Sequence, residues 1–321
     1  MNTDLLIANL TNPTLLFFLL GVIAHVVKSD LEIPPTTIKF ISIYLLFSIG
    51  FKGGQELAHG HMGSALVAPL FFGLAVASVI PLYAFFLIKG KLGVQNAGAV
   101  AAAYGSVSAV TFVAATGFLE AESIPFGGHM VAIMALMESP AIIVGMVLLM
   151  RYDKEEKERP SLGHMIKHSF TNASVLILIG SLLIGLVADA KQAEGIKPFT
   201  TDIFKGFLAI FLLEMGMVTA ARFAAFRKYG GFASTMAILF PLVNGSIVAW
   251  ASGFVATGLG DRFMFAVLAA SASYIAVPAA MRFAAPKADP GLYIPMALGV
   301  TFPFNITIGM PLFFAIVNAT V

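Results

Sequence analysis

Ten long apolar runs follow one another along the chain, each ended by charged or turn-forming residues. They span residues 13–28, 35–51, 62–88, 94–117, 125–150, 171–189, 198–220, 231–258, 262–283 and 290–320. A helix that crosses the hydrocarbon core of a bilayer needs about 20 predominantly apolar residues. The pattern therefore predicts an all-α integral membrane protein with ten transmembrane helices.

A strongly charged stretch, residues 151–170, divides these runs into two sets of five. At its centre stands Asp153-Lys154-Glu155-Glu156-Lys157-Glu158-Arg159. Such a run is costly inside a bilayer and is typical of a solvated linker. We expect residues 1–150 to form one five-helix unit and residues 171–321 to form a second.

The second unit repeats part of the first. Segment 102–110 aligns without gaps to segment 269–277, and five of the nine positions are identical. Both segments lie in the fourth helix of their unit. Because five is odd, the second unit enters the membrane from the opposite face, so we expect an inverted repeat, as in many secondary transporters. The alternative is a duplicated bundle whose small residues serve only close helix packing.

Both repeated segments carry residues unsuited to an uninterrupted helix. These are Tyr104-Gly105-Ser106-Val107-Ser108 and Ser271-Ala272-Ser273-Tyr274. Glycine and serine loosen a helix, and Pro278 lacks an amide hydrogen and crowds the carbonyl of Tyr274. We therefore expect the fourth and ninth helices to be broken near their middles. Irregular backbone at membrane depth is tolerated only where it lines a cavity or is buried in protein.

Two broken helices would point the N-termini of their restarted halves at the middle of the membrane. Free amide groups, the helix dipole and serine hydroxyls together favour a small anion. No lysine or arginine lies near either segment, which suits a small oxyanion better than a large organic acid. Alternatively, Ser106, Ser108, Ser271 and Ser273 donate only to carbonyls within their own helices.

A few polar residues lie inside the apolar runs. Acidic groups there are costly and usually functional; Glu138 is near the middle of the fifth helix and Glu214 nearer the end of the seventh. Glu138 is the better candidate for a sodium ligand or proton carrier, and a buried structural acid is the alternative. Asn96, Asn244 and Asn305 are expected to cap or bridge helices. Lys205, near a predicted helix start, is expected to reach the membrane interface.

The composition agrees with a membrane protein. Of 321 residues, 59% are hydrophobic and 11% charged, with a net charge of +2, whereas soluble domains average about 25% charged residues. The balanced charge does not suggest nucleic acid. The absence of cysteine excludes a thiol nucleophile, and Gly105-Ser106-Val107-Ser108-Ala109 does not fit a hydrolase elbow, because that motif places serine where Val107 stands. We do not expect an enzyme.

The loop charges predict the orientation. The linker and the loops on its side hold thirteen lysines and arginines, against four on the other side. Positive residues favour the cytoplasmic side. We therefore expect a cytoplasmic linker and both termini outside the cytoplasm.

The chain resembles the sodium-dependent bicarbonate permease family of the SbtA type over nearly its whole length. The resemblance is carried by Tyr104-Gly105-Ser106-Val107-Ser108, Met137-Glu138-Ser139-Pro140-Ala141, Met215-Gly216-Met217, the stretch from Ala269 to Pro278, and Ala288-Asp289-Pro290-Gly291-Leu292-Tyr293-Ile294. It implies sodium-coupled uptake of bicarbonate in a bacterial inner membrane. It also implies a homotrimer with an elevator-like split, in which helices 1, 2, 6 and 7 form the scaffold and helices 3, 4, 5, 8, 9 and 10 the mobile core.

The same resemblance implies site residues by position. The anion would contact Gly105, Ser106, Val107, Ser108, Ala272, Ser273 and Tyr274, and sodium would lie near Ser108, Thr111, Glu138, Ser271 and Ser273. Cyanobacterial members carry Ser-Ser-Ser-Asp where this chain has Ser271-Ala272-Ser273-Tyr274, so one acid expected at the ion site is missing. The resemblance further implies inhibition from the cytoplasmic side by a PII-like protein.

Two other functions stay open at this point. One is a sodium- or proton-coupled carrier of a different small anion. The other is a membrane receptor for a cytoplasmic PII-like regulator that transports little, for which the linker 151–170 is the only support in the sequence.

Overall fold

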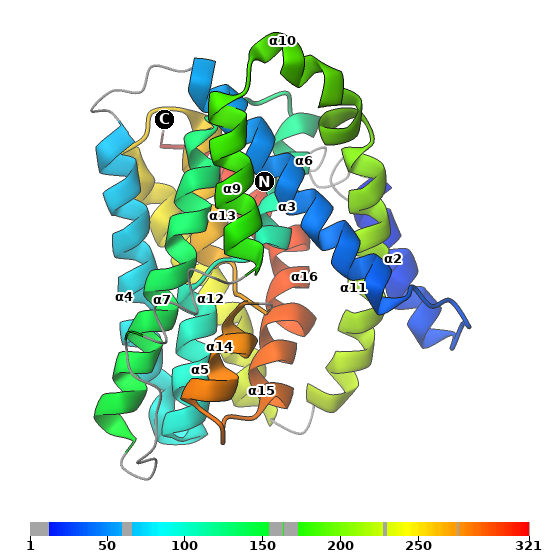
Figure 1. Ribbon diagram of the computed structural model, residues 1–321. Helices are drawn as coiled ribbons and strands as arrows, with labels where there is room; N and C mark the ends of the chain where they lie inside the picture. Colours follow the sequence, from blue (N-terminus) through cyan, green and yellow to red (C-terminus); the bar gives the residue numbers. More distant parts are fainter. Residues whose placement is uncertain are drawn as a thin grey trace.

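The computed structural model describes residues 13–59, 66–153, 163, 173–226, 230–274 and 276–320. These residues are helical wherever they form regular structure, and none of them is in a strand. Figure 1 shows the helices gathered side by side into one bundle, with α10 at one end and α15 near the other. We call these the α10 end and the α15 end.

Within the described residues, the first half of the chain forms six helices. Two of them, α5 and α6, follow one another within a single apolar run. The helices are α2 (Pro13–Val26), α3 (Pro35–His59), α4 (Val67–Leu92), α5 (Val94–Gly105), α6 (Ala109–Ala121) and α7 (His129–Tyr152).

The second half is more irregular, since several of its helices contain 3₁₀ or π turns. The α-helices are α9 (Ala173–Val187), α10 (Ala190–Ala193), α11 (Phe204–Phe226), α12 (Gly230–Ala251), α13 (Leu259–Ala270), α14 (Ala276–Ala284), α15 (Pro290–Pro295), α16 (Phe302–Phe304) and α17 (Met310–Asn318). The 3₁₀ turns are η2 (Glu194–Ile196) and η5 (Ser252–Phe254), and the π-helical turns are η3 (Pro198–Asp202), η6 (Met296–Thr301) and η7 (Asn305–Gly309).

Six segments among the described residues are long and apolar enough to cross a membrane. They are Val67–Leu92, Val94–Ala121, His129–Tyr152, Pro198–Ala221, Gly230–Phe254 and Pro290–Asn318. The multi-pass membrane class is therefore supported, while the count of ten stays a prediction. Some helix ends differ from those expected from the sequence, since α3 continues to His59 rather than ending at residue 51. Lys52, Gly53 and Gly54 do not end this helix, because its glycines pack against neighbouring helices. Of the predicted linker, only residues 151–153 and 163 lie within the described residues.

Two helix pairs pack through glycines. In the pair α3 and α9, a Cβ on Gly54 would overlap the backbone of Leu182, and one on Gly185 would overlap that of Phe51. In the pair α2 and α11, a Cβ on Gly216 would overlap the carbonyl of Phe18. Small residues that let helix backbones approach this closely are characteristic of membrane interfaces.

The other helices surround α5 and α13, which lie in the interior. All the residues of α13 from Arg262 to Ala270 are buried. At the α10 end, Asp261 accepts a hydrogen bond from the amide of Gly127 at 2.7 Å. At the α15 end, Gln95 donates to Asp153 at 2.8 Å and accepts from the amide of Lys287 at 2.8 Å. These bonds join the helices of the two halves at both ends of the bundle.

Candidate anion site

The first interruption separates α5 from α6. Ser106 and Ser108 have extended backbone on either side of Val107, and the side chain of Ser108 caps α6 by accepting from the amide of Thr111 at 3.2 Å. Serine is favoured at this position because its oxygen satisfies a first-turn amide. The hydroxyl of Ser106 donates to the carbonyl of Glu138 on α7 at 3.4 Å. The helix thus ends and restarts at the segment where the sequence predicts a break.

The second interruption follows α13, again at the predicted segment. After Ala270 the backbone is extended, and α14 begins at Ala276, with residue 275 outside the described residues. The hydroxyl of Ser271 donates to the carbonyl of Leu268 at 2.8 Å, which is the local bond that the alternative interpretation of the serines predicts. The Ser273 hydroxyl accepts from the amide of Val277 at 3.4 Å.

The two interruptions are hydrogen-bonded to each other although about 165 residues separate them in sequence. The amide of Ser273 donates to the carbonyl of Ala103 at 2.8 Å. The amide of Ser108 donates to the hydroxyl of Ser271 at 3.0 Å. Backbone amides that lack a partner in their own helix thus donate to groups from the opposite half of the chain. We call the two interruptions, joined by these bonds, the crossing.

The crossing is buried and closely packed. The six residues at its centre, Ser106, Val107, Ser108, Ser271, Ala272 and Ser273, are each at most 5% exposed. A Cβ on Gly105 would overlap the ring of Pro81 and press on Ala141, so only glycine allows α4 and α7 to approach the break this closely. In such surroundings a hydrogen bond to a charged ligand is stronger than in water.

Amide donors remain at the crossing for a ligand. The first amides of a helix have no intrahelical acceptor, and in α6 these belong to Ala109 and Val110, since Ser108 occupies that of Thr111. The α6 dipole adds partial positive charge at the same point. The geometry can therefore bind a small anion through backbone groups.

Glu138 lies beside the crossing on α7. Its backbone is placed there by Ser106, and its largely buried carboxylate forms no hydrogen bond or ion pair with the residues that the structure describes. The other predicted sodium ligands are hydroxyls: Thr111 is 1% exposed on α6, and Ser108, Ser271 and Ser273 form the crossing. No group of three or more His, Cys, Asp or Glu side chains gathers among the described residues, so a transition-metal site is not indicated there.

The Tyr274 hydroxyl is a second unsatisfied polar group at the crossing. It is buried without a hydrogen bond of normal geometry, and the side chain of Ser108 lies within reach of it. The other buried tyrosine nearby differs, because the hydroxyl of Tyr104 bonds to that of Thr301 at 2.7 Å.

Two polar residues of the last helical run support the crossing and were not recognised as site residues from the sequence. Thr301, in η6, bonds to Tyr104 and donates to the carbonyl of Ala237 at 2.7 Å. Asn305, in η7, donates to the carbonyl of Ala270 at 2.8 Å, the last residue of α13. Asn305 thus has the bridging role expected for it. The π turns that aim these residues have no signal in the sequence, although such turns often occur at functional sites.

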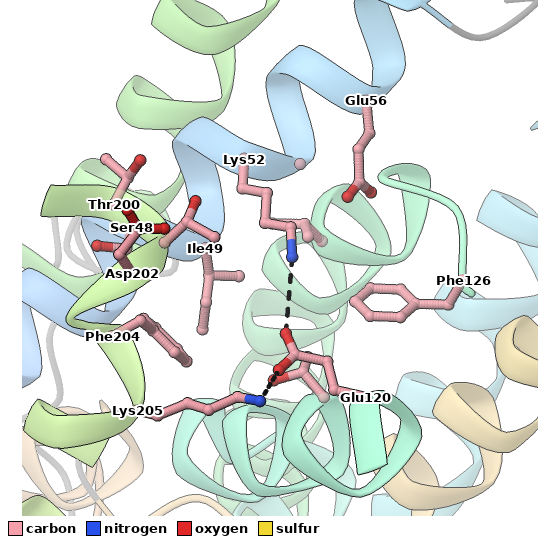
Figure 2. Close-up of a pocket in the computed structure, with 14 residues that line it drawn as sticks. Ser48, Ile49, Lys52, Glu56, Glu120, Phe126, Thr200, Asp202, Phe204 and Lys205 are labelled. Atoms are coloured by element: carbon pink, nitrogen blue, oxygen red, sulfur yellow. Dashed lines mark ion pairs between the residues drawn. The ribbon is translucent and has the colours of Figure 1, made fainter. Parts of the chain in front are cut away.

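A separate cavity of about 390 Å³ lies at the α10 end, between α3, α6, η3 and the start of α11. Figure 2 shows that Lys52 of α3 and Lys205 of α11 both point at Glu120 of α6, with Ser48 and Thr200 on the opposite wall. Lys205 lies 3.0 Å and Lys52 3.7 Å from the Glu120 carboxylate. Glu214, the other intramembrane acid, lies on α11 and does not line this cavity.

Comparison with known proteins points to the same kind of ligand, a small anion, as the geometry of the crossing. A search among curated proteins finds no match to the chain. A family model described as the Na⁺-dependent bicarbonate transporter superfamily matches residues 13–318. Membership implies a multi-pass membrane transporter rather than an enzyme, with sodium as the coupling ion and bicarbonate as the substrate of the family. On this match across almost the entire sequence, the chain belongs to the Na⁺-dependent bicarbonate transporter superfamily.

Proposed function

We propose that this protein is a secondary transporter that carries bicarbonate into the cytoplasm together with sodium. The observation that carries the proposal is the crossing: two interrupted helices, hydrogen-bonded to each other through Ser108, Ser271 and Ser273, beside an unpaired carboxylate. A small oxyanion and a cation fit this combination of amide donors and hydroxyl and carboxylate oxygens.

The anion is held without a basic side chain. Its donors are the first amides of α6 and groups from Gly105, Ser106, Val107 and Ser108 on one side, and from Ala272, Ser273 and Tyr274 on the other. Low exposure strengthens these bonds. A lysine or arginine would bind the anion more tightly but would also slow its release, which a transporter has to allow.

Sodium lies beside the anion, with Glu138 as its charged ligand and oxygens of Ser108, Thr111, Ser271 and Ser273 completing the shell. Hard cations prefer oxygen ligands of this kind. Glu138 is unpaired in the described residues, so occupancy by a cation removes the cost of an isolated buried charge. Binding of each ion then favours binding of the other, which is the basis of symport.

The architecture proposed for this function is ten helices in two inverted repeats, 1–150 and 171–321, joined by a cytoplasmic linker. The glycine-packed pairs, α2 with α11 and α3 with α9, form a scaffold. The remaining helices, tied at both ends of the bundle, move as one core in an elevator-like step. The proposal includes a homotrimer in a bacterial inner membrane, both termini outside the cytoplasm, and a cytoplasmic PII-like regulator.

Uptake into proteoliposomes tests the function. With an inward sodium gradient, labelled bicarbonate is expected to accumulate, and collapse of the gradient with an ionophore abolishes the accumulation. A panel of unlabelled small anions then measures selectivity. Sodium-dependent uptake of another anion, with no competition by bicarbonate, would make the protein a carrier for that anion. Absence of any uptake, together with capture of a PII-like protein, would favour the receptor function instead.

A further inference from the structure

The cavity at the α10 end contains charged groups that the crossing does not use. Glu120 stands in the last turn of α6 and has both carboxylate oxygens engaged, one by Lys205 and one by Lys52. The lysines come from α11 and α3, two helices of the proposed scaffold, whereas α6 belongs to the proposed core (Figure 2). The bridge therefore joins the two helix groups.

α6 connects this bridge to the crossing. It begins directly after Ser108 and is an uninterrupted helix to Ala121. At 1.5 Å per residue, Glu120 lies roughly 16 Å along the axis from Ala109. A helix of this length moves as a rigid element. The N-terminus of α6, whose amides lie at the crossing, therefore cannot shift relative to α3 while both ion pairs of Glu120 persist.

The bridge is suited to opening. The side chains of Lys52 and Lys205 are 47% and 69% exposed, and ion pairs in such settings are weak. The cavity wall also presents the Ser48 hydroxyl, which is buried without a hydrogen bond of normal geometry among the described residues, and a cavity of this size with polar groups in its wall can hold water. Water that solvates the released charges lowers the cost of separating them.

We propose that Glu120, Lys52 and Lys205 form an ion-pair latch that holds α6 against α3 and α11 in the conformation described here and opens when α6 moves. The movement rests on the proposed transport function. The latch itself concerns an equilibrium between two arrangements of these helices and can be measured without a transported substrate.

Cross-linking across the cavity tests the latch, because the natural chain contains no cysteine. The reporter is the full-length variant Ile49→Cys/Thr116→Cys, with one thiol on α3 and one on α6, both lining the cavity. Its reaction with a short bifunctional thiol reagent, in nanodiscs, measures how often the two helices lie together. Adding Glu120→Gln is expected to slow cross-linking about three- to tenfold, since each exposed pair shifts an equilibrium only a few-fold.

Matched variants separate the latch from a general change of charge. Glu122→Gln removes the same charge two residues away, where no described lysine pairs with it, and is expected to leave the rate unchanged. The full charge reversal Glu120→Lys/Lys52→Glu/Lys205→Glu places one ammonium group between two carboxylates and is expected to restore the rate. Lys205→Gln is expected to have a larger effect than Lys52→Gln, because its ion pair is shorter.

Equal cross-linking rates for Glu120→Gln and Glu122→Gln would overturn the latch, as would a failure of the reporter pair to cross-link at all. Both results leave bicarbonate uptake by the natural protein untouched. Conversely, a protein that transports no bicarbonate but shows the Glu120 effect would retain the latch and contradict the proposed substrate.

Discussion

The two interrupted helices are built from similar residues but are supported differently. The break after Gly105 is backed by α7, where the backbone carbonyl of the acidic residue Glu138 accepts a hydrogen bond from Ser106. The break after Ala270 is backed by the π turn η7, in which the neutral side chain of Asn305 donates to the carbonyl of Ala270. Two segments of similar sequence thus have an acidic residue beside one break and a neutral residue beside the other. Under the proposed function, the first break would carry the coupling to sodium and the second would position the anion.

The largest expected effect comes from removing the negative charge of Glu138, beside the break between α5 and α6. Glu138→Gln keeps the size of the side chain but lacks the charge that holds the cation. Interactions with charged groups in buried sites are worth about 1.5–3 kcal/mol, so sodium-stimulated bicarbonate uptake in proteoliposomes is expected to fall about tenfold or more.

The control for this prediction is Glu214→Gln, which removes an intramembrane acid from α11, away from the crossing. It is expected to retain sodium stimulation. If Glu138→Gln kept its full sodium dependence, or if both variants lost it equally, Glu138 would not be the coupling group.

The next prediction compares two buried tyrosines. The Tyr274 hydroxyl has no hydrogen bond of normal geometry among the described residues, with the Ser108 side chain within reach, whereas the Tyr104 hydroxyl is bonded to Thr301. Tyr274→Phe is expected to weaken bicarbonate binding about tenfold while leaving the unliganded protein as stable as before, because only a bond to the anion is lost. Tyr104→Phe is expected to lower the free energy of unfolding by about 1 kcal/mol without changing affinity.

Thermal melting of the solubilised protein over a range of bicarbonate concentrations measures both the stability and the bicarbonate affinity of each variant. The melting temperature without ligand reports stability, and its rise with concentration reports affinity. Unchanged affinity in Tyr274→Phe would show that its hydroxyl faces no anion.

A smaller effect is expected at the bond that joins the two breaks. Ser271→Ala leaves the buried amide of Ser108 without its acceptor, which costs about 1–2 kcal/mol of stability. Ser42→Ala is the control, because the Ser42 hydroxyl bonds only within its own helix, to the carbonyl of Ile38. Equal melting temperatures for the two variants would mean that the bond across the crossing contributes nothing to stability.

Much of the fold follows from local properties of the chain. The breaks at Ser106–Ser108 and after Ala270 could be predicted because glycine and serine disfavour a helix interior wherever the segment lies. The position of Glu138 at the same depth followed from its place within an apolar run. The bridging role of Asn305 could likewise be expected from a polar side chain in such a run.

The rest depends on tertiary contacts that a single sequence does not reveal. The bond between Ser108 and Ser271 joins residues 163 positions apart, and nothing local selects that pairing. The π turns at η6 and η7 conform to their neighbours rather than to a sequence signal. Glu120 has no distinguishing signal in the sequence, because only the fold brings Lys52 and Lys205 to its carboxylate.

The most direct test of the central claim is an experimental density map of the protein with bicarbonate and sodium. The account predicts anion density at the crossing, against the first amides of α6 and near the Tyr274 hydroxyl, with a cation beside Glu138. Anion density held instead by Lys52 and Lys205 in the cavity at the α10 end, with the crossing empty, would contradict it.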